Sequence, residues 1–318
     1  MNKTIKIGTR DSELALWQAH YVENQLNALG YKTEIVAVKS TGDVILDVPL
    51  YELGITGIFT KTLDIAMIKG EVDIAVHSMK DVPTALPKGI VQAAVPKRAN
   101  TADILVQKSD MVFYNAPATV ATGSLRRQAQ WLHRYPHHNV TDLRGNVNTR
   151  LKKLDENNWQ GAIFAAAGLE RLNFYSGQKV KSPAFEGTAE VLDWMVPAPA
   201  QGAMLAVAME HDAYSREALS RLNDKPTEIA THIERQFLKK LEGGCTAPIG
   251  ALATFIDDEI RFEGVLLSLD GRQRLYIEKS VHINADYRNF GNLCAEEILQ
   301  SGGDALMKTL RAQLNKKK

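Results

Sequence analysis

Arginine side chains recur at places where the sequence predicts that a strand gives way to a helix. These arginines are Arg10, Arg126, Arg127, Arg144 and Arg150. A guanidinium group pairs bidentately with carboxylates or phosphates and stays charged at any useful pH. The N–H groups at a helix start attract anions and disfavour cations, so two adjacent arginines in one first turn indicate a bound ligand. One such arginine is most simply a solvated surface charge, but the recurrence predicts a site for a polyanionic ligand.

Cys245 lies in a glycine-rich stretch that directly follows a segment of helical periodicity, residues 226–240. A loop cysteine held between glycines can present its sulfur to a cleft. The alternative is that Gly243 and Gly244 form an ordinary helix C-cap and that Cys245 is a small buried hydrophobe. The residues alone leave both interpretations open. The second cysteine, Cys294, falls on a predicted C-terminal helix, and we interpret it as part of the core.

Lys80 and Asp81 follow a buried-strand pattern over residues 72–78. Ligands of open α/β sheets bind outside the carboxyl ends of the strands, which is where these two residues fall. An aspartate among cations is ionised, and in a cleft it could bind N–H groups, stabilise a cation or carry protons. The alternative is that Asp81 forms a turn before Val82 and Pro83. His77, on the apolar strand itself, is better interpreted as a core histidine than as a base.

The elements that must position these residues alternate between strands and helices, which predicts the α/β class. The spacing predicts strands over 4–9, 33–38, 72–78, 90–95, 103–107, 119–122, 140–143, 162–165 and 204–209. It predicts helices from about residue 11 to Gly30 and over 59–68, 124–133, 147–154 and 166–172. We expect one α/β domain from residues 1–97 with 198–212, and a second from residues 98–197. Two crossings between such domains predict a hinged cleft that holds a small ligand.

The pattern changes near residue 213, where two helices lead to Cys245. Strands over 251–255, 259–268 and 273–282 then form a predicted antiparallel meander, followed by one helix over 293–314. The turns between the strands are expected at Asp257-Asp258 and Asp270-Gly271. Residues 213–318 are therefore expected to form a third, small α+β domain.

Composition limits the classes of partner. The chain of 318 residues has 38 Lys and Arg against 37 Asp and Glu, a balance that argues against bulk binding to nucleic acid or to an anionic membrane. The two cysteines show neither metal-ligand spacing nor a disulfide framework. Neither a signal peptide nor a membrane-spanning apolar run is evident. We therefore expect a cytoplasmic protein with reduced thiols and no bound metal.

Taken together, the motifs show a resemblance that runs in register over nearly the whole chain. The chain resembles the porphobilinogen deaminase family, also called hydroxymethylbilane synthases. The motifs that carry the resemblance are Gly8-Thr9-Arg10, His77-Ser78-Met79-Lys80-Asp81-Val82-Pro83, Ser124-Leu125-Arg126-Arg127, Asp142-Leu143-Arg144-Gly145-Asn146, Pro197-Ala198-Pro199 with Gln201-Gly202, and Leu241-Glu242-Gly243-Gly244-Cys245.

The resemblance implies that the first two domains are similar to type 2 periplasmic binding proteins and enclose a cleft. It implies a dipyrromethane cofactor joined to Cys245 through a thioether. Four porphobilinogen molecules would be added head to tail, each with loss of ammonia, before hydrolysis releases hydroxymethylbilane. It also implies a small-molecule substrate, a monomeric enzyme, and no nucleic-acid or membrane partner.

The resemblance also implies roles for individual residues. Asp81 would be catalytic: it would bind pyrrole N–H groups, assist proton transfer and stabilise the cationic azafulvene left when ammonia departs. The residues implied to bind the cofactor are Cys245, Lys80, Asp81, Ser124, Arg126, Arg127, Arg144 and Arg150. The residues implied to bind substrate are Arg10, Ser12, Phe59, Arg144, Arg150, Arg171 and Arg235.

The chain departs from the family pattern at two places. Thr56 stands where the family commonly has a lysine, and Gly123 stands where a serine is frequent.

Other classes of protein also account for part of the pattern. A non-catalytic carboxylate-binding protein explains the cleft and the arginines but gives Cys245 no task. A thiol hydrolase would use Cys245 with His77 or His232 as its base. A nucleic-acid module is disfavoured by the charge balance.

Overall fold

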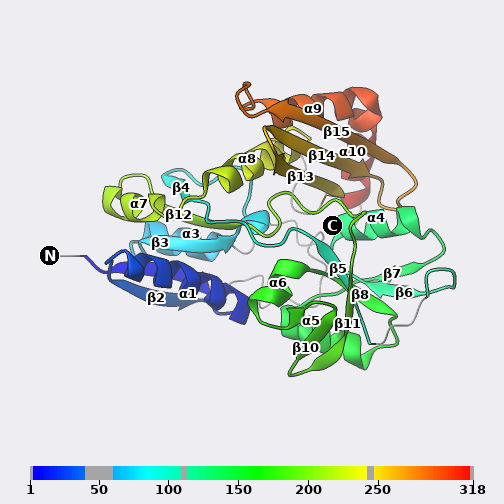
Figure 1. Ribbon diagram of the computed structural model, residues 1–318, viewed down its shortest axis with the longest axis horizontal. Helices are drawn as coiled ribbons and strands as arrows, with labels where there is room; N and C mark the ends of the chain where they lie inside the picture. Colours follow the sequence, from blue (N-terminus) through cyan, green and yellow to red (C-terminus); the bar gives the residue numbers. More distant parts are fainter. Residues whose placement is uncertain (1–2, 40–59, 109–112, 242–246, 316–318) are drawn as a thin grey trace. The chain divides into compact units, whose positions relative to one another are not determined.

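The computed structural model describes residues 3–39, 60–108, 113–241 and 247–315 (Figure 1). The chain divides into two compact units. The first comprises Met1–Ile45, Ile55–Ala99 and Gly202–Ile229, and the second comprises Leu46–Gly54, Asn100–Gln201 and Ala230–Lys318. Within the described ranges, no helix is both long and apolar enough to cross a membrane.

The first unit is built on a mixed sheet with the strand order β2-β1-β3-β12-β4. The strands β1, β2 and β3 run parallel, and β12 is antiparallel to both β3 and β4. Apolar side chains of β1 and β3 pack with those of α1 into one core, as the predicted β-α-β opening requires. The elements are β1 (Ile5–Arg10), α1 (Glu13–Ala28), β2 (Thr33–Val38), α3 (Lys61–Ile68), β3 (Ile74–Ser78), β4 (Ile90–Ala94), β12 (Met204–Met209) and α7 (Ala213–Ser220).

A second mixed sheet, with the order β7-β6-β8-β5-β11-β10-β9, forms part of the second unit. Here β7, β6 and β8 run parallel, whereas β5 is antiparallel to β8 and to β11. The elements are β5 (Asp103–Gln107), β6 (Thr119–Ala121), α4 (Leu125–Arg134), β7 (Asn139–Thr141), α5 (Val147–Glu156), β8 (Gly161–Ala165), α6 (Ala166–Arg171), β9 (Tyr175–Ser176), β10 (Lys179–Ser182) and β11 (Phe185–Val191).

The C-terminal part of the second unit is an antiparallel meander of β13 (Ile249–Ile256), β14 (Glu259–Leu267) and β15 (Arg274–His282), with the helices α9 (Phe290–Ile298) and α10 (Asp304–Asn315). Helix α8 (Lys225–Lys240) begins in the first unit and belongs to the second from Ala230 on. Gly264 permits close packing, because a Cβ atom there would lie 2.7 Å from Cζ of Phe237 on α8. The predicted α/β class and the α+β character of this region are confirmed, and Figure 1 shows α9 and α10 beside the meander.

Two differences separate the predicted elements from the observed ones. The strands β9, β10 and β11 were not predicted. The single helix predicted over 293–314 is wrong, because a turn over Leu299–Gly303 separates α9 from α10 and Gly302 has a φ of 103°. Helix α7 lies in the first compact unit, where it packs on β4 and β12. The division into three domains, with its boundaries, stays a prediction.

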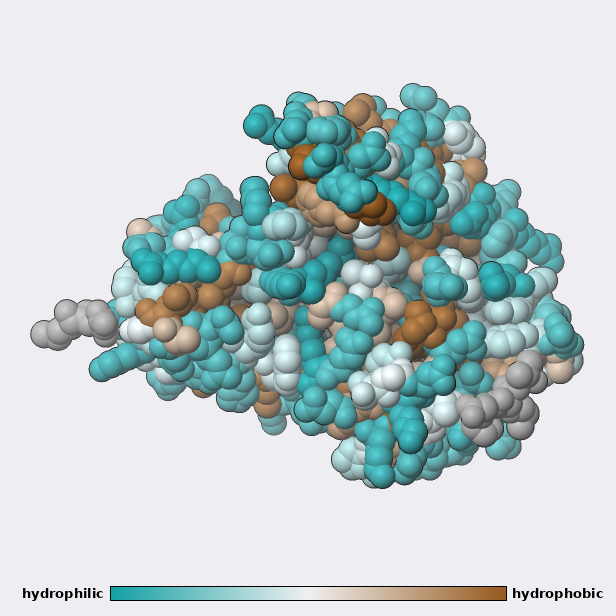
Figure 2. All heavy atoms as spheres, in the orientation of Figure 1, coloured by the Kyte–Doolittle hydropathy of each residue, from teal (hydrophilic) through white to brown (hydrophobic). Residues whose placement is uncertain are grey.

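Large apolar side chains that remain exposed are spread over several elements, among them Ile68 on α3 and Leu293 on α9. Figure 2 shows the hydrophobic residues of one face in separate groups between hydrophilic ones. Scattered apolar residues are usual on protein surfaces. These exposed apolar residues therefore do not by themselves mark a functional site.

Candidate active site

The carboxyl edge of the first sheet collects the predicted acid and its neighbours. Ile7 pairs with Ile74 and Gly8 with Ala75, so the parallel strands β1 and β3 end at the same edge. Arg10 is the last residue of β1, and Lys80 and Asp81 lie in a short 3₁₀ helix, Met79–Asp81, directly after β3. All three side chains are partly exposed. The edge thus carries a partly exposed carboxylate and two cations, at the place where ligands of α/β sheets bind.

Hydrogen bonds fix the backbone on both sides of Asp81. Nε2 of the buried Gln18, on α1, donates to Oγ of Ser78 over 2.9 Å. The backbone N–H of Met79 donates to the carbonyl of Ala203 over 3.0 Å, and that of Val82 donates to Met79 over 3.2 Å. The carboxylate of Asp81 therefore projects from a turn whose position is set by α1, β3 and the start of β12.

His77 lies on β3 with 6% of its surface exposed. Burial lowers its pKa to about 4, and the positive charge of Arg10 contributes to the same direction of shift. The buried position confirms the prediction of a core histidine. Such a side chain stays neutral near pH 7 and is a poor proton acceptor, so it is not the base that a thiol hydrolase requires.

Ser12 occupies the N-cap position of α1 with an extended backbone. Its hydroxyl makes no capping hydrogen bond within the described residues. The predicted position of Ser12 at the helix start is correct.

The carboxyl edge of the second sheet collects most of the predicted arginines. Because β7, β6 and β8 are parallel neighbours, the segments that follow them begin at one edge. Two contacts tie the segment after β6 to its neighbouring strands: the N–H of Thr122 donates to the carbonyl of Thr141 on β7 over 2.9 Å, and Nη1 of Arg127 donates to the carbonyl of Ile163 on β8 over 2.9 Å. The residues at this edge are Ser124, Arg126 and Arg127 after β6, Arg144 and Arg150 after β7, and Arg171 at the end of α6 after β8.

Local sequence explains how the two junctions after β6 and β7 are formed. Ser124 is the N-cap of α4, and its hydroxyl accepts from the N–H of Arg127 over 3.5 Å. A Cβ atom at Gly123 would lie only 2.7 Å from the carbonyl oxygen of Leu143, so glycine allows the two segments to approach. The departure from the family at Gly123 therefore has a local structural reason.

After β7, the chain turns at Gly145, whose φ is 113°. Asn146 then caps α5 by accepting from the N–H of Thr149 over 2.9 Å, and Nε of Arg150 donates to the carbonyl of Gly145 over 2.7 Å. A positive φ suits glycine, which carries no Cβ atom. This turn holds Nε of Arg150 next to the junction that also carries Arg144.

A residue that the sequence analysis did not single out, Asp103, lies at the centre of this edge. It is the first residue of β5 and is fully buried. Its Oδ2 accepts from Nη1 of Arg126 over 2.6 Å, and its Oδ1 accepts from Nε of Arg127 over 2.9 Å. Burial alone would raise the pKa of Asp103, but the charges of both arginines and their hydrogen bonds hold it well below its usual range. The carboxylate is therefore ionised.

Three further predicted arginines differ in their burial. Arg144 is 5% exposed, and burial lowers its pKa although the charge of Asp142 acts in the opposite direction. Arg171 is 8% exposed, and Arg235, on α8, is partly buried. Buried guanidiniums are costly unless anions or hydrogen bonds surround them.

The structure thus brings Arg126 and Arg127 together on one carboxylate and places Arg144, Arg150, Arg171 and Ser124 at the same edge of one unit. Arg10, Ser12, Lys80 and Asp81 belong to the other unit. Cys245 and Phe59 lie outside the described residues, as does Thr56.

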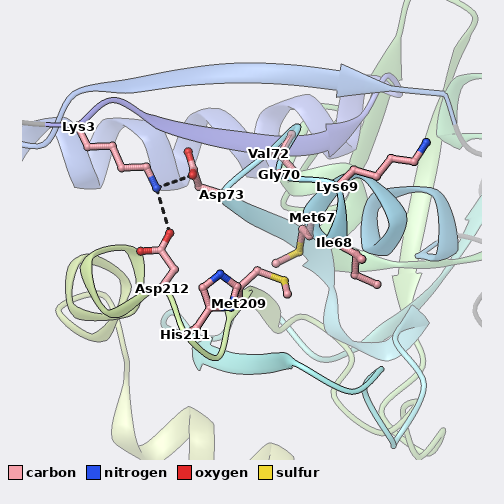
Figure 3. A pocket seen from close by; sticks show the side chains of 10 residues that line it. All are labelled: Lys3, Met67, Ile68, Lys69, Gly70, Val72, Asp73, Met209, His211 and Asp212. Atoms are coloured by element: carbon pink, nitrogen blue, oxygen red, sulfur yellow. Dashed lines mark hydrogen bonds and ion pairs between the residues drawn. The ribbon is translucent and has the colours of Figure 1, made fainter.

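A hollow of about 450 Å³ opens at the other end of the first sheet (Figure 3). Nζ of Lys3 lies 2.6 Å from Asp73 and 3.2 Å from Asp212. The three lining charges Lys3, Asp73 and Asp212 are thereby paired with one another, and Asp81 lies at the opposite edge. Within the described ranges, no cluster of His, Cys, Asp or Glu could hold a metal ion.

Several known proteins are similar to this chain. Among solved structures, the chain is similar to a periplasmic substrate-binding protein of an ABC transporter from Coxiella burnetii, with 12% identity and a TM-score of 0.42 over 73% of this chain and 96% of that one. Among named proteins, it is 40% identical to a porphobilinogen deaminase of Campylobacter hominis, over 97% of this chain and 98% of that protein. It is 39% identical to one of Pelotomaculum thermopropionicum, over 98% of this chain and 99% of that protein.

Two family models also match the chain. The model described as "Porphobilinogen deaminase, dipyromethane cofactor binding domain" matches residues 5–217. The model described as "Porphobilinogen deaminase, C-terminal domain" matches residues 229–300. Together they cover most of the sequence in the expected order, and the chain therefore belongs to the porphobilinogen deaminase family.

Proposed function

We propose that this chain joins four molecules of porphobilinogen head to tail on a dipyrromethane cofactor and releases hydroxymethylbilane. Each addition forms one carbon–carbon bond and releases one ammonia, and a final hydrolysis consumes one water. Membership of the porphobilinogen deaminase family supports the reaction class. The observation that carries the proposal is the group of buried guanidiniums at one sheet edge.

The chemistry of these residues fits the cofactor. Every pyrrole ring derived from porphobilinogen bears an acetate and a propionate, so a growing chain accumulates negative charge. Guanidinium forks bind carboxylates bidentately and remain charged. Nε of Arg126 is buried and has no hydrogen-bond partner among the described residues, which is a donor that a ligand carboxylate would satisfy.

We assign the cofactor carboxylates to Lys80, Ser124, Arg126, Arg127, Arg144 and Arg150, and the attachment point to Cys245. We assign the incoming substrate to Arg10, Ser12, Phe59, Arg144, Arg150, Arg171 and Arg235. When bound, the dipyrromethane supplies the pyrrole carbon to which the first substrate is joined.

Asp81 performs the proton chemistry in this proposal. Its carboxylate accepts hydrogen bonds from pyrrole N–H groups and balances the positive charge that develops as ammonia departs. The same carboxylate can hold a proton between successive additions. The fixed turn after β3 supports this role, because a proton-transfer group must keep its distance from the reacting atoms.

The proposed enzyme acts as a monomer in the cytoplasm, as predicted from the sequence and the family resemblance.

The mass of the intact protein tests the proposed function. Freshly purified protein should exceed its sequence mass by one dipyrromethane, the excess should vanish in Cys245→Ser, and Cys294→Ser should retain it. Active wild-type protein with the bare sequence mass would contradict the proposal.

A further inference from the structure

Asp103 occupies an unusual position for a carboxylate. It begins β5, a strand whose residues are all buried, and none of its own surface is exposed. An unpaired charge in such a place would be strongly unfavourable. The stability of this edge of the sheet therefore depends on the groups that pair with the carboxylate of Asp103.

Two arginines and one amide share the carboxylate of Asp103. Nη1 of Arg126 lies 2.6 Å from Oδ2, and Nε and Nη2 of Arg127 lie 2.9 and 2.8 Å from Oδ1. Nε2 of Gln201 donates to Oδ1 over 2.9 Å. Both arginines also donate to backbone: Arg126 to Val196 over 2.8 Å and Arg127 to Ile163 over 2.9 Å.

The two guanidiniums are used differently. Arg127 places Nε, Nη1 and Nη2 on protein oxygens. Arg126 places Nη1 on two protein oxygens, whereas its Nε has no partner among the described residues. One negative charge between two positive charges also reduces their mutual repulsion and leaves a net positive charge. The arrangement fixes one side of the Arg126 fork and leaves the other side for an anion.

We propose that Asp103 is a positioning residue, which holds Arg126 and Arg127 together so that Arg126 can bind a carboxylate of the tetrapyrrole ligand. Arg127 and Gln201 complete the support. This inference rests on the proposed function, because it assigns the ligand of Arg126. It assigns Asp103 no contact with substrate or cofactor.

The decisive variant is Asp103→Asn, which keeps the shape of the side chain and removes its charge. The arginine pair then repels, and Arg126 loses a charge-assisted hydrogen bond. Because Arg126 is assigned to a cofactor carboxylate, we expect the ratio of cofactor-loaded to unloaded protein, measured by intact mass, to fall about tenfold. The kcat per loaded molecule should stay within about twofold, because Arg126 binds ground state and transition state alike.

Glu234→Gln is the matched control. Glu234 is also fully buried, and its carboxylate accepts from the backbone N–H groups of Ala200 over 2.6 Å and Ala253 over 2.8 Å. The Glu234→Gln variant should lower the melting temperature as Asp103→Asn does, but it should leave KM and the cofactor content unchanged. If Asp103→Asn also lowers only the melting temperature, Asp103 is merely structural and the inference is wrong.

Should Asp103→Asn fail to fold, Gln201→Met decides instead. It removes one donor to Asp103 and leaves both arginines, so the ratio of cofactor-loaded to unloaded protein should fall about two- to fivefold, which corresponds to the loss of a single hydrogen bond. An unchanged ratio would overturn the inference. Failure of the proposed function would show separately, as wild-type protein without excess mass or turnover, and would overturn both.

Discussion

His77 is buried on β3 beside the positive charge of Arg10, and both the burial and that charge disfavour protonation of its ring. The pair lies at the sheet edge that carries Asp81. A neutral histidine adds no further positive charge next to the acid. The relationship also makes the stability of the protein depend on pH.

We predict that the folded protein loses stability as the pH falls from about 6.5 towards 4. The pKa of His77 is lowered to about 4 in the folded state, whereas an unfolded histidine titrates near 6.5. The unfolded state therefore binds more protons in this window, and stability falls as the pH falls. Between pH 7.5 and pH 5.0 the loss should be about 2 kcal/mol. Urea unfolding at both pH values measures it.

His77→Gln is the control for this prediction, because glutamine does not titrate. The variant should be less sensitive to the same pH change by about 2 kcal/mol, whatever its stability at pH 7.5. An equal pH dependence in both proteins would mean that other groups cause it.

Asp81→Asn should lower kcat about 10²- to 10⁴-fold, the range typical of a group that transfers protons in the transition state. The asparagine can still accept a hydrogen bond but can neither carry a proton nor balance a positive charge. Steady-state assays of ammonia release measure the loss, and circular dichroism checks the fold. Glu217→Gln, an exposed carboxylate that pairs with Arg221 at 3.4 Å, is the control and should retain full activity. Near-normal turnover in Asp81→Asn would remove Asp81 from its proposed role.

Arg144→Leu should reduce kcat/KM for porphobilinogen about 10- to 100-fold, because a hydrogen bond to a charged group contributes about 1.5–3 kcal/mol. Arg144 is buried at the arginine-rich edge, whereas Arg216 is exposed and donates to the carbonyl of Glu210 over 2.9 Å. Arg216→Leu is therefore a charge-matched control that should behave as wild type. If the two variants were equally active, the charge of Arg144, at the carboxyl edge of the second sheet, would make no contribution to ligand binding.

The sequence predicted the elements with strong apolar patterns and missed those without them. The bounds of β5 agree with the prediction because Ile104, Leu105 and Val106 form a continuous buried run. The strands β10 and β11 carry Lys, Glu, Ser and Thr between few apolar residues, so periodicity gave no strand signal. Gly302 breaks the last helix through its backbone conformation, which an apolar pattern does not report.

For the site as well, the sequence predicted some features and missed others. Position at a strand end predicted the places of Arg126, Arg127 and Arg144, because parallel strands bring their carboxyl ends to one edge. It did not reveal that Arg126 and Arg127 share Asp103. One signal was available: an aspartate at the start of a buried strand is rarely buried without a cationic partner. Which arginines supply that partner depends on the sheet order, which local patterns do not determine.

Thiol counting gives a further prediction about Cys245. The sequence contains two cysteines, and a sulfur in a thioether does not react with thiol reagents. Cys294 is buried with 1% of its surface exposed, and burial raises its pKa to about 12, so it is also inert in the folded protein. In guanidinium, Cys294 is exposed and reactive. Wild-type protein should therefore show almost no reactive thiol when folded and one thiol per chain when unfolded.

Two variants identify the thiol that reacts. Cys245→Ser should also show one thiol when unfolded, because Cys294 remains, whereas Cys294→Ser should show none. A count of two in unfolded wild-type protein would mean that Cys245 carries a free thiol and that no cofactor is attached to it. Because the count is made in denaturant, a change in packing around Cys294 cannot produce the same result.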